Sequence, residues 1–224
     1  MNLLLSVFLL TLSFCCSNVD SKPPEEAAVE FVGDWWIKEG KTSDGKDYEG
    51  NAKIIQLDST FMLRRATMSG SHAGVGLRDG ENLFFSWGAK GSHGIILYKI
   101  GEEKLDGRWT DARSGGMTGT ESIVLQTKGE LVGKHKLTGT NSTGGGAYKM
   151  DLEITRENEI YTLVWSSGGN SYKGVGVVEG DNLAAAFSMD GSHVFGHYRL
   201  SGKELDGRWL AQDATSFASE KMRH

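Results

Sequence analysis

Hydrophobic and polar residues alternate along most of the chain from Phe31 onward. The stretch 47–57 illustrates the pattern, because its apolar and polar side chains fall on opposite faces: Tyr48, Ala52 and Ile54 against Glu49, Asn51 and Lys53. A period of two residues is typical of a β-strand with one face in a core and the other in water. Separated by glycine-containing turns, such stretches predict strands near 33–38, 47–57, 60–67, 72–79, 82–88, 93–100, 104–111 and 117–126.

The second half of the chain repeats the first at an offset of 100 residues, so that LDGRW occurs at 105–109 and again at 205–209. Roughly 22 of about 77 positions compared without gaps are identical, and self-similarity of this kind indicates a repeated fold. We therefore expect two domains with the same fold, at 31–127 and 128–224.

Each repeat holds a series of short strands with short connections, as in an antiparallel meander. Closing such a meander into a barrel removes its two exposed edges. We therefore predict an all-β protein made of two tandem small up-and-down antiparallel β-barrels, each similar in fold to the barrels of avidins and lipocalins (the calycin type), with about eight strands. One larger β assembly that combines both repeats is the alternative.

Composition supports this fold class and narrows the range of partners. Glycine accounts for 31 of 224 residues and proline for only 2, which suits many strands joined by glycine turns. The formal net charge is −5 and there are no basic runs, so the clustered lysines and arginines of a nucleic-acid surface are missing. Charged side chains on the outer strand faces do not suit the lipid-facing band of an outer-membrane barrel.

The first 30 residues differ from the rest of the chain. Residues 1–16, MNLLLSVFLLTLSFCC, hold an apolar run that is too short for a membrane-spanning helix and suits an export signal. Residues 17–30 are polar and are expected to form a tether. The end of the apolar run, LSFC at 12–15, resembles a bacterial lipobox, although Phe14 stands where a lipobox usually has a small residue. We expect an exported protein that is either lipid-anchored to the cell envelope through Cys15 (or Cys16), its only membrane contact, or simply secreted.

The repeated LDGRW motif presents different residues on its two faces. In a strand, Leu105, Gly107 and Trp109 point one way, and Asp106 and Arg108 point the other. We interpret the motif as scaffold, with the tryptophan as a core anchor and the aspartate and arginine as a solvated pair. The alternative is a charged binding site formed by the two copies of that pair: Asp106, Arg108, Asp206 and Arg208.

Two histidines recur within the repeated segment GSH, which makes His93 and His193 candidates for a metal site or a general base. Strand alternation places both on the face opposite the apolar residues, so we expect them on the surface or in a loop. His193 and His197 do not form a zinc pair either, because four residues of a strand span about 13 Å.

Signatures of catalysis are missing from the sequence. It holds no nucleophile elbow, P-loop or dinucleotide fingerprint. We therefore predict no catalytic residue, no cofactor and no metal site, while an enzyme on an unfamiliar β scaffold stays open.

Four segments together resemble a group of exported bacterial proteins built from similar repeats: YEGNAKIIQ, GVGLRDGENL, ILYKIGEEKLDGRWTD and GGMTGTE. Some members of that group carry a fibronectin-binding label, so the resemblance implies an exported binding protein without a defined chemistry. The second repeat departs at its end, where SFASE replaces TGTE and Glu220 falls one residue out of register.

We therefore expect a non-catalytic exported binding module that acts at the cell envelope or surface on an extracellular or envelope macromolecule. A calycin-like carrier of a small hydrophobic ligand is the first alternative, and an enzyme is the second. A cavity would favour the carrier. The small side chains at 184–186 predict that such a cavity lies in the second repeat.

Overall fold

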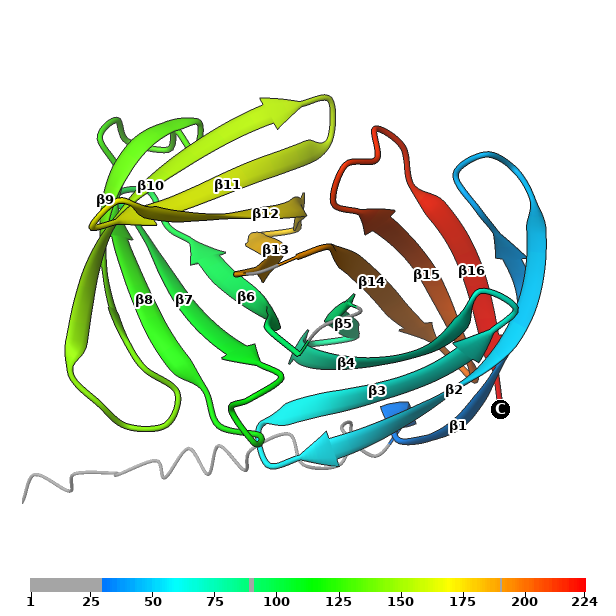
Figure 1. Ribbon diagram of the computed structural model, residues 1–224. Coiled ribbons are helices and arrows are strands. Elements are labelled where there is room, and N and C mark those ends of the chain that lie inside the picture. The colour runs from blue at the N-terminus through cyan, green and yellow to red at the C-terminus, as the bar shows by residue number, and fades with distance from the viewer. Residues whose placement is uncertain (1–29, 89–90, 190) are drawn as a thin grey trace, which may run out of the picture.

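The computed structural model describes residues 30–88, 91–189 and 191–224. The predicted export signal, nearly all of the tether, and both cysteines lie outside these ranges. The described residues form two closed antiparallel barrels of eight strands each, lying side by side (Figure 1). This confirms the predicted all-β fold of two barrels, and within these ranges no helix is long or apolar enough to span a membrane.

The first barrel, which we call barrel 1, is built from two separate parts of the chain. In spatial order its strands are β1 (Gly33–Lys41), β16 (Ala218–Arg223), β15 (Glu204–Ala211), β14 (His193–Ser201), β5 (Asn82–Gly88), β4 (Gly70–Asp79), β3 (Thr60–Thr67) and β2 (Asp47–Leu57). Pairing of β1 with both β2 and β16 closes it.

Barrel 2 is one continuous meander. Its strands are β6 (His93–Ile100), β7 (Lys104–Asp111), β8 (Gly119–Val124), β9 (Gly133–Thr140), β10 (Ala147–Glu157), β11 (Ile160–Ser167), β12 (Asn170–Glu179) and β13 (Asn182–Ser188). Pairing of β13 with β6 closes it.

The barrels do not follow the predicted domain boundary between 127 and 128. The last three strands of each repeat close the barrel that the other repeat begins, so that β14 pairs with β5 and β6 pairs with β13. The predicted domains 31–127 and 128–224 are therefore two sequence repeats but not two barrels. The physical reason is that β6 and β14 carry matching inner residues, such as Tyr98 and Tyr198, and the alternation of a strand does not distinguish between equivalent partners.

Three apolar clusters form the core of the described ranges. One fills each barrel, and it includes the inward residues that the strand pattern predicts, such as Leu83, Phe85 and Trp87 in barrel 1. The third cluster lies between the barrels and joins the outer faces of β4, β5, β14 and β15 to those of β6, β12 and β13. Strands β5 and β13 therefore bury both faces, which explains their nearly continuous apolar runs LFFSW and LAAAF.

The sequence suggests that the alanines at 184–186 leave open space, but in the structure they are packed. Ala184 and Ala186 pack in the layer between the barrels, and Ala185 packs in the core of barrel 2.

Candidate functional site

The LDGRW motif acts mainly as scaffold, but its charged residues do not pair with each other. Leu105 and Trp109 are buried as predicted. Asp106 instead binds Lys104, with 2.6 Å between Oδ2 and Nζ, and accepts a hydrogen bond from Ser122. Arg108 donates a hydrogen bond to the carbonyl oxygen of Arg78 in the other barrel. The predicted solvated Asp–Arg pair is therefore wrong for this copy.

The second copy of the motif also connects the two barrels. Arg208 lies 2.6 Å from Glu159 and 3.5 Å from Glu179, both in barrel 2, and its guanidinium covers Phe217 at 4.8 Å. Asp206 pairs with Lys221 at 3.7 Å. Both arginines therefore hold the barrels against each other, and neither aspartate meets an arginine of its own motif.

His93 and His193 lie at the point where the two repeats exchange strands, and both are buried, with 3% and 1% of their surface exposed. His193 pairs with Gly88 and His93 pairs with Ser188 in the strand register. The prediction of surface histidines is wrong because the outer faces of β6 and β14 are each covered by the opposite barrel. Burial, followed by the charge of His93, lowers the pKa of His193 to about 4. Across the described ranges, no cluster of three or more potential ligands could hold a metal ion.

His197 is a further buried histidine in the layer between the barrels. Its ring stacks on Phe84 at 4.8 Å, and Nε2 lies 2.9 Å from Oδ1 of Asn82. Burial is the main cause that lowers the pKa of His197 to about 4, and the positive charge of Arg208 lowers it further. Glu179 lies 3.8 Å from its Nδ1 but already pairs with Arg208, so burial decides the direction of the pKa shift.

Each barrel encloses one glutamate that the sequence analysis did not select as a site residue. Glu121 on β8 and Glu220 on β16 take equivalent places, since they pair with Gly107 and Gly207 respectively. They are 5% and 2% exposed. Because an isolated carboxylate is costly to bury, the groups around each one determine its role.

In barrel 1, the glutamate is neutralised by a cation of the protein itself. Glu220 accepts hydrogen bonds at 2.5 Å from both Tyr48 and Tyr198, and at 2.9 Å from Nη2 of Arg65. Arg65 also lies with its guanidinium carbon 4.8 Å from the centre of the Trp87 ring, a cation–π contact.

In barrel 2, the glutamate has the same two tyrosine partners but no cation. The hydroxyls of Tyr98 and Tyr148 donate to Glu121, the second at 2.8 Å. Trp165 occupies the place of Arg65, because it pairs with Tyr172 as Arg65 pairs with His72. Within the described part of the chain, no lysine, arginine or histidine forms an ion pair with Glu121, and burial raises its pKa.

The hydroxyls and the indole around Glu121 partly offset the effect of burial. Tyr98, Tyr148 and the N–H of Trp165 all favour the charged carboxylate. Burial and the nearby carboxylate raise the pKa of both tyrosines well above the usual value, so their hydroxyls stay protonated as donors. The group therefore forms a donor-lined carboxylate site rather than a pair of exchangeable acids.

Glycines on neighbouring strands make room for these tyrosines. A Cβ atom on Gly107 would lie 2.5 Å from the ring of Tyr98, and one on Gly139 would lie 2.3 Å from the ring of Tyr148. The glycine of LDGRW therefore lets a tyrosine ring lie across the strand and reach the buried glutamate.

Each barrel has a cavity of about 240 Å³; Glu121 itself lines the one in barrel 2, whereas Arg65, the partner of Glu220, lines the one in barrel 1. The polar residues that line the cavity in barrel 1 include Arg65 and His72. The cavity in barrel 2 is mainly aromatic and apolar, and its lining residues are Ile96, Trp109, Glu121, Asn141, Tyr148, Met150, Trp165, Tyr172, Phe187 and Met189. Residues of both repeats therefore build it, and not those of the second repeat alone.

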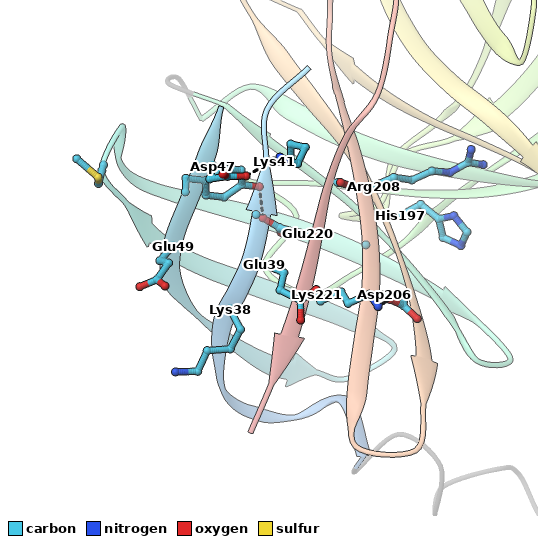
Figure 2. A pocket seen from close by; sticks show the side chains of 15 residues that line it. Lys38, Glu39, Lys41, Asp47, Glu49, His197, Asp206, Arg208, Glu220 and Lys221 are labelled. Carbon is cyan, nitrogen blue, oxygen red and sulfur yellow. Dashed lines mark hydrogen bonds and ion pairs between the residues drawn. The ribbon is translucent and has the colours of Figure 1, made fainter. Parts of the chain in front are cut away.

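A larger hollow, of about 1010 Å³, lies along the wall of barrel 1, and Tyr48 and Glu220 are among the residues that line it. Figure 2 shows its charged side chains spread over β1, β2, β15 and β16 rather than converging on one point. Several are already paired with each other on the surface, including Lys41 with Asp47 at 2.6 Å. The smaller cavity in barrel 2 is the better candidate site, because its walls are mainly aromatic and apolar and its buried carboxylate has no cationic partner among the described residues.

A signal for the buried glutamates is present in the strand pattern. In β8, Glu121 shares its face with Gly119 and Ile123, and in β16, Glu220 shares its face with Ala218 and Met222. A charged residue at an apolar position indicates a buried partner or a site. No protein-family model, curated protein or solved structure matches the chain.

Proposed function

We propose that this protein is a non-catalytic binding protein that holds a small molecule in the mouth of barrel 2. The observation that carries the proposal is the aromatic cavity of about 240 Å³ beside the buried carboxylate of Glu121. An apolar pocket with one convergent polar group is the usual form of a small-molecule site. The volume lies below the roughly 300–1,000 Å³ of pockets for drug-sized ligands, which supports a compact ligand.

The arrangement of polar groups favours binding over catalysis. Glu121 is surrounded by tyrosine hydroxyls with raised pKa values, which are hydrogen-bond donors and poor nucleophiles. The same network in barrel 1 is closed by Arg65. We propose that the protein acts outside the cytoplasm, either anchored through Cys15 or secreted, in line with the character of its first residues.

Thermal denaturation of the full chain with a panel of compact compounds tests the proposal. A ligand of the cavity should raise the melting temperature in a concentration-dependent way, since it binds only the folded state. Asn141 lies exposed at the rim, so Asn141→Trp should cover the mouth and abolish the shift. Thr143→Trp, on the same exposed turn but outside the cavity lining, is the matched control.

Two results would contradict the proposal. One is a ligand that shifts the melting temperature of Asn141→Trp as much as that of the unchanged protein. The other is a panel without any cavity ligand, together with capture of a specific macromolecule by the full chain from extracellular matrix or envelope extracts. The second result would support a macromolecular binding module instead.

A further inference from the structure

The two barrels offer an internal comparison, because the buried carboxylate has a cationic partner in barrel 1 and none among the described residues in barrel 2. In barrel 1, Glu220 accepts three donors: two tyrosine hydroxyls and the guanidinium of Arg65. In barrel 2, Glu121 accepts hydrogen bonds from two tyrosine hydroxyls. A carboxylate has about four acceptor positions, so Glu121 has capacity for a further donor.

We propose that the cavity of barrel 2 binds an organic cation, a compact amine or ammonium compound with an apolar or aromatic body, whose charged group pairs with Glu121. This inference rests on the proposed function and names the class of its ligand. The cation would take the role that the Arg65 side chain has in barrel 1.

The aromatic walls match such a ligand. Trp165 and Tyr172 stack at 5.3 Å, and Phe187 lies 5.8 Å from each of them. Trp109 lies 6.4 Å from Phe187 and completes the wall. Aromatic faces attract cations, most strongly where water is excluded, and ammonium ligands are commonly held in cages of such rings. Barrel 1 shows this contact within the protein, where Arg65 lies over Trp87.

A second polar group in the cavity wall also lacks a hydrogen-bond partner among the described residues. The indole nitrogen of Trp109 is buried and has no hydrogen-bond partner in the described residues, although it lies near enough to favour ionisation of Tyr148. The equivalent nitrogen of Trp209 donates to Tyr48 at 2.7 Å. An acceptor on the body of the ligand, such as a hydroxyl, would satisfy Trp109.

Three compounds of similar shape and different charge test the proposal: phenethylamine, 2-phenylethanol and phenylacetate. Titration calorimetry with the full chain at neutral pH should show that phenethylamine binds at least about tenfold more tightly than the alcohol, and that phenylacetate binds weakest. Glu121→Gln should remove this preference for the amine and change the affinity for the alcohol by less than about threefold. Glu153→Gln removes the same charge from the exposed face of barrel 2 and should change neither affinity.

Substitutions at position 165 separate the cation site from the aromatic wall. Trp165→Arg places a guanidinium where barrel 1 has Arg65, so it should pair with Glu121 and abolish amine binding. Trp165→Leu removes the ring without adding a cation, so it should weaken binding of both compounds but retain the preference for the amine. Urea titration of each variant verifies that the barrel is folded.

The possible outcomes distinguish this inference from the proposed function. If phenethylamine and 2-phenylethanol bind equally well in the cavity, the protein binds small molecules but the preference for cations is wrong. The same conclusion follows if Trp165→Arg is folded and still binds the amine. If none of the three compounds binds, the cation site is wrong, whereas the proposed function fails only if the panel of compact compounds also yields no cavity ligand and the chain captures a macromolecule.

Discussion

The buried ion pair in barrel 1 permits a quantitative test of the network around Glu220. Arg65→Met keeps an unbranched apolar stem against Trp87 but removes the charge 2.9 Å from the carboxylate. Because the two side chains are 5% and 1% exposed, solvent cannot replace the lost partner. Breaking a buried pair from one side costs about 3–5 kcal/mol, a large part of the roughly 5–15 kcal/mol that stabilises a typical domain.

The second step of this test removes the carboxylate charge as well. The Arg65→Met/Glu220→Gln double variant leaves no uncompensated charge, so it should lose less stability than the sum of the two single variants, by about 1–3 kcal/mol. Urea titrations followed by circular dichroism measure each variant. Arg64→Met, on the exposed face of the same strand, is the control and should stay within about 0.5 kcal/mol. If Arg65→Met costs no more than Arg64→Met, the buried pair does not carry the stability that we assign to it.

Three further predictions concern His197, the repeated tryptophans and the glycine of LDGRW. His197 has a pKa of about 4 in the folded chain against 6.5 when free, so it should cost the protein up to about 3 kcal/mol of stability as pH falls from about 6.5 to about 4. His197→Leu should reduce this loss in urea titrations without removing it, because His193 also has a pKa of about 4. Trp109→Ala should cost about 3–5 kcal/mol and the half-buried Trp209 less, measured in the same way. Gly107→Ala should cost about 1–3 kcal/mol by displacing the ring of Tyr98.

Each of these predictions has a matched control or a contradicting result. A steeper stability loss in acid for His197→Leu than for the unchanged protein would contradict the assignment of a neutral buried imidazole. Equal losses for the two tryptophan variants would show that exposure does not separate their roles. Gly91→Ala, where an added Cβ meets none of the described residues within 4 Å, should be nearly neutral in contrast to Gly107→Ala.

Strand positions and inward faces could be predicted from the sequence because each strand follows a period of two residues. The predicted limits of 47–57 and 60–67 agree with those of β2 and β3. Burial of His93 and His193 could not be predicted in this way, since a period of two gives the face of a strand but not what covers it. In each case that face is covered by the opposite barrel, whose position depends on which copy of a repeated strand pairs with which.

The buried glutamates were predictable in part. Glu121 alternates with Ile123 on an apolar face, which marks it as unusual for a surface carboxylate. Its tyrosine partners come from β6 and β10, and the sequence separation between these strands hides their convergence. Alignment of the two repeats at the offset of 100 shows arginine at position 65 and tryptophan at position 165. The sequence does not show that both residues lie near a buried glutamate, and only that position gives the difference a functional interpretation.

The exchange of strands between the repeats also sets an order of events during synthesis. Barrel 2 is contiguous from His93 to Ser188, so all its strands are available before β14 leaves the ribosome. Strands β1 to β5 are made first, yet they remain an open sheet with two unpaired edges until β14 to β16 arrive. Open edges of this kind pair readily with other chains. Barrel 1, whose strands β1 to β5 are synthesised first, is therefore the last barrel to close, and its open edges are exposed to aggregation for the longest time.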